Sequence, residues 1–298
     1  MVLYIDGPQA EEKRSTAQVR EMGRAKALGR VEASIDTFES RIDSGLRIRK
    51  QHFIDVKKGL GASFCWRLAS REHFAEYMRG LGWVVKVCTT EADVAIAQDA
   101  QPGDITISAD SDMLGYASVV TLWRPVSRNL ILVYSLPDPL ATIGLSRTQL
   151  TALAVVSRND YQRNINSLGP STNYGVIKAI GDRPGKALLK TKYIYIGILV
   201  NLYSLVLIAT AFFFSSLQID PREIVSAYLT DSKVVTKNTY HETFAMSIRV
   251  FVEYQQTQIE PVILQQPSQT VFEALQQRFK DLCSRRDSMK EAQAQGAR

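Results

Sequence analysis

The carboxylates of segment 87–123 are the residues whose types and spacing point most directly to chemistry. The segment holds six Asp and Glu residues and no Lys, Arg or His, although the whole chain has a formal net charge of +6. Four of the six form two acidic pairs, Glu91-x-Asp93 and Asp110-x-Asp112, each after an apolar run typical of a buried strand, WVVKV or DITIS. In a parallel sheet both pairs would meet at one edge, where the ligands of open α/β sheets collect.

A hard divalent cation is the ligand that such an acidic edge favours. Crowded carboxylates repel one another unless a positive charge lies between them. Because the donors in both pairs are carboxylates, Mg²⁺ or Mn²⁺ is favoured over Zn²⁺. The alternative is structural, since Thr90 with Asp93 fits a capping box, and Ser108, Asp110 or Ser111 could cap the next helix. Either pair alone fits the structural role better, whereas the two pairs together favour a metal site.

The N-terminal part of the chain adds a third acidic position and two basic candidates. VLYI predicts a short strand that ends at Asp6, and the charged segment 9–50 predicts helix with few large apolar residues, so we expect it to bury little. Lys13 and Arg20 lie seven and fourteen residues after Asp6 and share a helix face that could point back over the acidic edge. A solvated, charged helix is the alternative.

Composition places these residues in a basic α/β protein. The 298 residues, 45% of them hydrophobic, suit one large α/β domain or one domain with appendages. Segment 8–58 carries twelve Lys and Arg against eight acids, and segment 146–190 carries seven against two, which favours a polyanionic partner. The three cysteines are far apart, which indicates neither disulfides nor a zinc site and fits a reducing compartment. The short VLYI run does not resemble a secretory signal peptide.

The rest of the chain predicts a β-hairpin, a helical hairpin and an apolar segment. TLWRPV and LILVYSL predict the β-hairpin, and residues 53–81 predict helix. Helices from Ser146 to Val156 and up to Ile180, joined by a Leu-Gly-Pro turn, could lay backbone N–H groups against a phosphate. Asp160, in the loop between them, could cap a helix or extend the acidic cluster. Residues 193–217 are uncharged and long enough to span a bilayer, with a lineage-specific insertion or translated intron as the alternative.

The order of these motifs resembles the XPG-type flap endonuclease family, the structure-specific 5′ nucleases with a PIN-like α/β core. YIDG, EADVA, SADSDML, RNDY and the turn SLGP follow the order and spacing of that family over about residues 2–180. The resemblance implies an α/β fold with a PIN-like, parallel-rich sheet flanked by helices, a helical arch and a helix–turn–helix DNA-binding element.

The resemblance also implies roles for individual residues. It assigns two Mg²⁺ ions to six carboxylates and the contact with the scissile phosphate to Lys13 and Arg20. The six carboxylates are Asp6, Glu91, Asp93, Asp110, Asp112 and Asp160, and the turn that binds nucleic acid is Ser167, Leu168, Gly169 and Pro170. The implied function is Mg²⁺-dependent, two-metal hydrolysis of phosphodiester bonds in branched or flapped DNA, in the nucleus.

Departures from the family pattern keep a second interpretation open. The family begins with an earlier strand and helix that carry another active-site Asp, so we expect an N-terminal truncation that removes one metal ligand. The turn SLGP has one glycine where the family often has two, which argues against the K⁺ ion that the family binds there. The alternative function is therefore a nuclease-like DNA- or RNA-binding scaffold that cannot cut, with membrane anchoring as a variant of either.

The expected organisation follows from these assignments. It comprises a nuclease core over 1–145, with the arch at 9–58 and the acidic segment at 83–125, a helix–turn–helix element at 146–190, a hydrophobic insert or transmembrane segment at 191–217, and a C-terminal helical region at 218–298.

Overall fold

The computed structural model describes residues 1–46, 49–181, 219–262 and 266–296. The chain divides into two compact units, which we describe separately. The first comprises residues 1–90 and 260–298, and the second comprises residues 91–259. Segment 191–217, for which either a hydrophobic insert or a transmembrane segment was expected, lies outside the described residues. Within the described ranges, no helix is both long and apolar enough to cross a bilayer.

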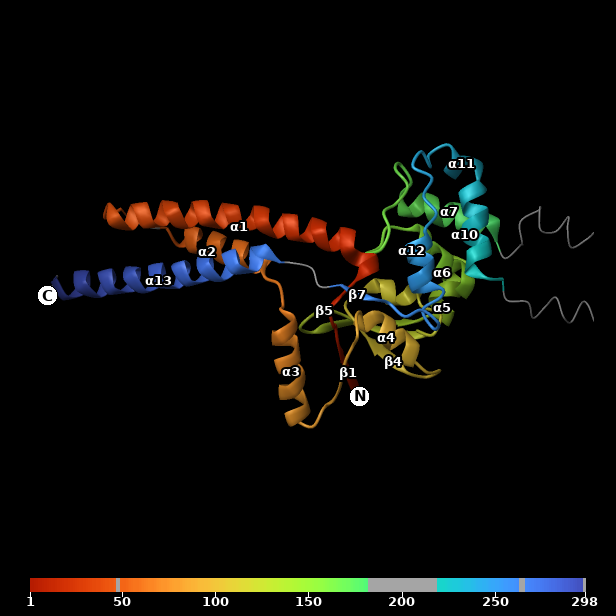
Figure 1. Ribbon diagram of the computed structural model, residues 1–298, viewed down its shortest axis with the longest axis horizontal. Coiled ribbons are helices and arrows are strands. Elements are labelled where there is room, and N and C mark those ends of the chain that lie inside the picture. The colour runs from red at the N-terminus through yellow and green to blue at the C-terminus, as the bar shows by residue number, and fades with distance from the viewer. Residues whose placement is uncertain (47–48, 182–218, 263–265, 297–298) are drawn as a thin grey trace, which may run out of the picture. The chain divides into compact units, whose positions relative to one another are not determined.

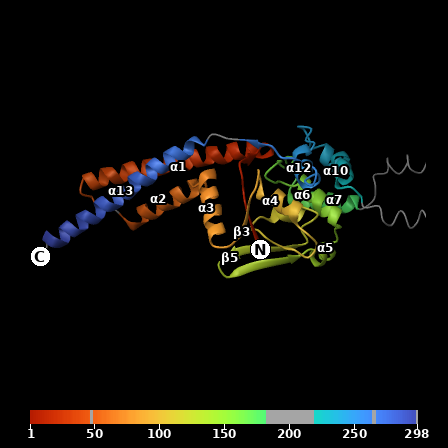
Figure 2. The same ribbon diagram turned by 60° about the horizontal axis from the view of Figure 1, so that its bottom comes forward.

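Three long helices form the larger part of the first unit. They are α1 (Arg14–Asp43), α2 (Lys50–Ser63) and α13 (Pro267–Gly296), which lie side by side in Figures 1 and 2. Their shared core is Leu28, Val31, Ile35, Phe38, Ile42, Phe53, Val56, Leu60, Phe272, Leu275, Phe279 and Leu282. The expectation that segment 9–50 buries little is therefore wrong. Apolar residues recur every three or four positions in the second half of α1, and α13, distant in sequence, covers that stripe.

Short strands complete the first unit together with α3 (Leu68–Gly80) and the 3₁₀-helix η1 (Glu11–Lys13). The strand β1 (Val2–Ile5) pairs in parallel with β3 (Val84–Val87), and β2 (Gln9–Ala10) pairs antiparallel with β7 (Pro261–Val262). Val84 is 63% exposed, so the expectation that WVVKV is a buried strand is wrong. A two-stranded ribbon offers too few neighbours to cover both of its faces.

The second unit contains a three-stranded sheet in the order β4-β5-β6. The strand β4 (Ile105–Ile107) is parallel to β5 (Thr121–Ser127), and β5 is antiparallel to β6 (Leu130–Ser135), which confirms the predicted β-hairpin. The remaining elements are α4 (Ala92–Asp99), the 3₁₀-helix η2 (Ser111–Gly115), α5 (Pro137–Ile143), α6 (Arg147–Val156), α7 (Pro170–Ile180), α10 (Pro221–Thr230), α11 (Ser232–Val235) and α12 (Ala245–Phe251).

The core of the second unit forms where α6 packs against η2, α7, α10 and α12 (Figure 1). Its largest fully buried side chains are Met113, Tyr116, Leu122, Ile177, Ile224, Tyr228, Phe244 and Phe251. The α/β class is thus confirmed. The two strands that precede the acidic pairs differ from expectation in one respect, because β3 pairs with β1 whereas β4 pairs with β5, so they belong to separate sheets among the described residues.

Candidate functional site

Asp6 lies at the carboxyl end of β1, in the first unit. The guanidinium of Arg71 donates from Nη1 to the backbone carbonyls of Asp6 at 3.0 Å and Gly7 at 2.8 Å. The Gly7 N–H donates to the Thr90 carbonyl at 2.7 Å. A Cβ on Gly7 would lie 2.1 Å from the Cys88 carbonyl oxygen, so this close approach requires glycine. The backbone that carries Asp6 is therefore fixed against the end of β3.

Glu91 and Asp93 stand at the start of α4, in the second unit. Glu91 is the N-cap residue and is buried, but its side chain makes no capping hydrogen bond. The capping box expected from Thr90 and Asp93 is therefore wrong, because the helix begins one residue later than that motif requires. Asp93 lies in the first turn of α4, where the helix dipole stabilises a carboxylate.

Asp110 and Asp112 flank the start of η2. Asp110 is the N-cap residue, and its Oδ1 accepts a 2.9 Å hydrogen bond from the Asp112 N–H, while Ser108 Oγ accepts one from the Asp110 N–H at 3.1 Å. The expected capping role of Asp110 is thus confirmed. Asp110 is exposed and Asp112 is half-buried, so this acidic pair can be reached from solvent.

Asp160 is held in a loop organised by its neighbour Asn159. Asn159 Oδ1 accepts from the N–H groups of Tyr161 at 2.9 Å and Gln162 at 2.8 Å, and its Nδ2 donates to the Ala154 carbonyl of α6 at 2.9 Å. This arrangement closes the turn after α6 and directs Tyr161 into the core, where it is 6% exposed.

Three of the predicted ligands affect the pKa of the buried Tyr161 hydroxyl. Burial raises the pKa of Tyr161 well above its usual range, and the negative charges of Glu91, Asp93 and Asp160 raise it further, against a hydrogen bond with Tyr116 that lowers it. Carboxylates from two separate segments of the second unit therefore contribute to the electrostatic environment of Tyr161. Tyr161 and Asn159 were not predicted as functional residues, because an aromatic residue after a polar turn is equally typical of a core position.

The donor set fits a hard divalent ion in its chemistry, since all six predicted ligands are carboxylates. Within the described ranges, however, no three His, Cys, Asp or Glu residues are grouped so that they could hold a metal ion. Glu91, Asp93 and Asp160 thus share an electrostatic effect on Tyr161, and the six-residue metal centre stays a prediction.

The two basic candidates differ in their surroundings. Lys13 closes η1, serves as the N-cap residue of α1 and is 7% exposed. Arg20 lies on α1 and is exposed to solvent. Only Arg20 thus has the accessibility that a direct contact with a phosphate requires in this conformation.

The predicted helical hairpin is present as α6 and α7. Ser146 and Gln149 form a capping box at the start of α6, and Gln149 Nε2 donates to the Ile177 carbonyl of α7 at 3.0 Å. In the turn, Ser167 adopts a φ of 67°, Leu168 is buried, Gly169 is the N-cap residue of α7 and Pro170 is its first residue. Because glycine offers no side chain to cap α7, the N–H groups of the first turn suit an anion.

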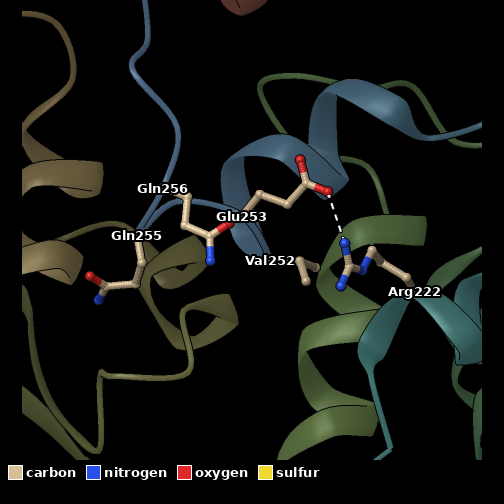
Figure 3. A pocket seen from close by; sticks show the side chains of 5 residues that line it. All are labelled: Arg222, Val252, Glu253, Gln255 and Gln256. Carbon is tan, nitrogen blue, oxygen red and sulfur yellow. Dashed lines mark hydrogen bonds and ion pairs between the residues drawn. The ribbon is translucent and has the colours of Figure 1, made fainter.

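The second unit also has a small pocket. Its volume is about 90 Å³ and it is lined by Arg222, Val252, Glu253, Gln255 and Gln256 (Figure 3). An ion pair between Arg222 and Glu253, with an N–O distance of 3.3 Å, spans it. No predicted site residue lines this pocket.

The chain is similar in sequence to two endonucleases. It is 29% identical over 203 residues to "Flap endonuclease 1" of Methanocella arvoryzae, and the match covers 61% of this chain and 54% of that protein. A shorter match to "Single-strand DNA endonuclease 1" of Oryza sativa subsp. japonica is 30% identical over 82 residues and covers 26% of this chain and 13% of that protein. In sequence the chain is therefore similar to XPG-type flap endonucleases, as the order of its motifs predicts. The chain spans about half the length of the Methanocella arvoryzae protein, so an activity like that of the relative is a proposal for this chain.

Solved structures of nucleases show a weaker similarity. The catalytic core of Rad2 in complex with DNA substrate matches with a TM-score of 0.42 at 15% identity, covering 92% of this chain and 72% of that one. Human GEN1 in complex with Holliday junction DNA matches with a TM-score of 0.35 at 15% identity, covering 74% of this chain and 54% of that one. Both TM-scores are below 0.5, so these matches decide neither the fold nor the ligand. No family model matches the chain.

Proposed function

We propose that this protein is a Mg²⁺-dependent, structure-specific endonuclease that hydrolyses phosphodiester bonds in branched or flapped DNA. The observation that carries the proposal is the 29% identity over 203 residues with a flap endonuclease. The acidic pairs of the sequence support it, because carboxylates from several segments are the ligands that a metal-dependent reaction of this kind would use.

The carboxylates would hold the metal. Asp6, Glu91, Asp93, Asp110, Asp112 and Asp160 form the proposed ligand set, for Mg²⁺ or Mn²⁺. When bound, two divalent ions activate water and stabilise the leaving oxygen. The exposed Arg20 would bind the phosphate near the reacting bond, and Lys13 would add positive charge from its buried position at the start of α1.

The α7 end of the helical hairpin would bind the duplex. The turn Ser167–Pro170 leads into the first turn of α7, whose backbone N–H groups have no side-chain cap and suit a phosphate of the DNA backbone. Such contacts carry no sequence information, so binding is expected to weaken as salt concentration rises and to depend on DNA shape. The nucleus is the proposed location, since branched DNA is the proposed substrate.

A nuclease-like protein that binds DNA or RNA without cutting is the second candidate. It is favoured by the lack of a formed group of three potential metal ligands in the described part of the chain. The two functions differ in whether the nucleic acid is cleaved when Mg²⁺ is present.

Cleavage of a labelled 5′-flap duplex, with Mg²⁺ and with EDTA, tests the proposal. Asp112→Asn removes a proposed ligand, and Asp104→Asn is its matched control. Asp104 is an exposed carboxylate of the same segment, and its Oδ2 accepts a 2.9 Å hydrogen bond from the Gln101 N–H. We expect Mg²⁺-dependent cleavage that Asp112→Asn abolishes and Asp104→Asn retains. Flap binding without cleavage in the unsubstituted protein supports the second candidate, and loss of both binding and cleavage contradicts both.

A further inference from the structure

Arg147 carries a positive charge at a helix position where electrostatics disfavour one. It is the first residue of α6, at the positive end of the helix dipole. Burial lowers the pKa of its guanidinium to about 10, and its Nε is inaccessible to solvent and has no hydrogen-bond partner among the described residues. A half-buried cation of this kind is unfavourable unless hydrogen bonds compensate its partial desolvation.

The guanidinium of Arg147 binds the end of η2. Its Nη1 donates to the Leu114 carbonyl at 2.6 Å, and its Nη2 donates to the Tyr116 carbonyl. The carbonyl between these two, that of Gly115, accepts a 2.9 Å hydrogen bond from the buried Thr151 hydroxyl, one turn further along α6. Three successive carbonyls of one short loop are therefore bound by a single helix.

Close backbone packing reinforces these hydrogen bonds. A Cβ on Gly115 would lie 2.8 Å from the Cβ of Ala154, so the backbone of η2 packs directly against a side chain of α6. The opposite end of η2 begins with Asp110 and includes Asp112. The helix that holds η2 also leads into the loop of Asn159 and Asp160.

We propose that Arg147 is a positioning residue that fixes the Asp110–Asp112 loop on α6 and so sets its geometry relative to Asp160. The proposal rests on the proposed function in one respect, because it takes Asp110 and Asp112 as metal ligands. The proposal explains why an arginine occupies the first position of α6. The two guanidinium nitrogens of Arg147 hold the end of the loop on α6, so that the carboxylates of Asp110 and Asp112 keep their positions when a divalent ion binds.

Variants of the full-length chain separate this role from a general loss of folding. Arg147→Met keeps the approximate length of the side chain and removes both donors, and Arg147→Lys keeps the charge but can reach only one carbonyl. Thr151→Val removes the second anchor with little change in shape. Arg128→Met is the matched control, since Arg128 is exposed in the turn between β5 and β6.

Two measurements do not depend on catalysis. Hydrogen exchange reports the opening of residues 111–116, and titration with Mn²⁺, followed by electron paramagnetic resonance, reports metal affinity. We expect Arg147→Met to raise exchange in 111–116 while exchange in α10 is unchanged, and to weaken Mn²⁺ binding about 10- to 100-fold, as removal of groups that orient metal ligands does. Arg147→Lys and Thr151→Val should give smaller changes in the same direction.

The outcomes of these measurements are distinct. Exchange in 111–116 and Mn²⁺ affinity that match the unsubstituted protein in Arg147→Met would overturn the proposal. If that variant does not fold, unchanged values in both Arg147→Lys and Thr151→Val would overturn it. If the unsubstituted protein binds no Mn²⁺ and cuts no flap, the proposed function fails, while the exchange of 111–116 still decides whether Arg147 fixes the loop.

Discussion

Tyr228 gives the sharpest test of how the helical hairpin is held together. Its side chain is fully buried in α10, and its hydroxyl donates a 2.7 Å hydrogen bond to Asn173 Oδ1 in α7. Asn173 Nδ2 in turn donates to the Val156 carbonyl of α6 at 3.3 Å. Tyr228→Phe removes one hydroxyl from this network and leaves the Asn173 oxygen without that donor, so the free energy of unfolding at pH 7 should fall by about 1–2 kcal/mol.

The effect of the substitution should depend on pH. Burial, together with the negative charge of Asp231, raises the pKa of Tyr228 to about 12. In the unfolded chain a tyrosine has a pKa of about 10. Because the folded protein keeps the proton longer, the stabilisation from the neutral hydroxyl is complete below pH 10 and is lost as pH rises toward 12. At pH 11, which is one pH unit above the pKa of tyrosine in the unfolded chain, the free energy of unfolding is lower by about 1.4 kcal/mol.

Urea unfolding between pH 7 and pH 11 measures this loss of unfolding free energy. The gap in unfolding free energy between the unsubstituted protein and Tyr228→Phe should shrink from about 1–2 kcal/mol to nearly zero at pH 11. Tyr240→Phe is the control, because Tyr240 is 81% exposed and its loss should change neither the stability nor its pH dependence. A gap for Tyr228→Phe that is the same at pH 7 and pH 11 would refute the inference that a neutral hydroxyl is held in the core.

Three further variants test other parts of the structure. Phe279→Ala, in the shared core of α1, α2 and α13, should cost about 3–5 kcal/mol of unfolding free energy by urea titration, whereas Val271→Ala, an exposed position on α13, should cost little. Gly7→Ala should lower the melting temperature measured by circular dichroism, because the added Cβ would lie 2.1 Å from a backbone oxygen and must push β1 away from β3. Asp110→Ser keeps a capping oxygen, so we expect stability within about 0.5 kcal/mol of the unsubstituted protein but loss of flap cleavage. Unchanged melting of Gly7→Ala, or cleavage retained by Asp110→Ser, would contradict these expectations.

Local elements could be predicted from the sequence because their signals lie within a few residues. The helix from Ser146 to Val156, the turn before α7 and the β-hairpin all occur where the pattern placed them. Each depends on backbone preferences and on neighbours close in the chain.

Packing between distant segments could not be predicted in the same way. Segment 9–50 looks too charged to bury much, yet α1 forms a core with α13, and Phe279 of α13 lies 5.9 Å from Phe53 of α2 between ring centroids. The apolar stripe on α1 predicts burial only once α13, the helix that covers it, is known. For the same reason the apolar letters of WVVKV predicted burial, whereas Val84 has too few neighbours in a two-stranded ribbon to be covered.

The candidate site shows the limit of sequence patterns most clearly at Asp110. The sequence offered helix capping and metal binding as alternatives, but a carboxylate has two oxygens, and the cap bond to the Asp112 N–H uses only Oδ1. Capping fixes the side-chain rotamer and so reduces the entropy that a metal would otherwise have to offset on binding. The two roles are therefore compatible, and a stable cap is what a ligand at the start of a short 3₁₀-helix requires. Because an aspartate in either role has the same sequence signature, only a substitution that keeps the cap and removes the charge can distinguish them.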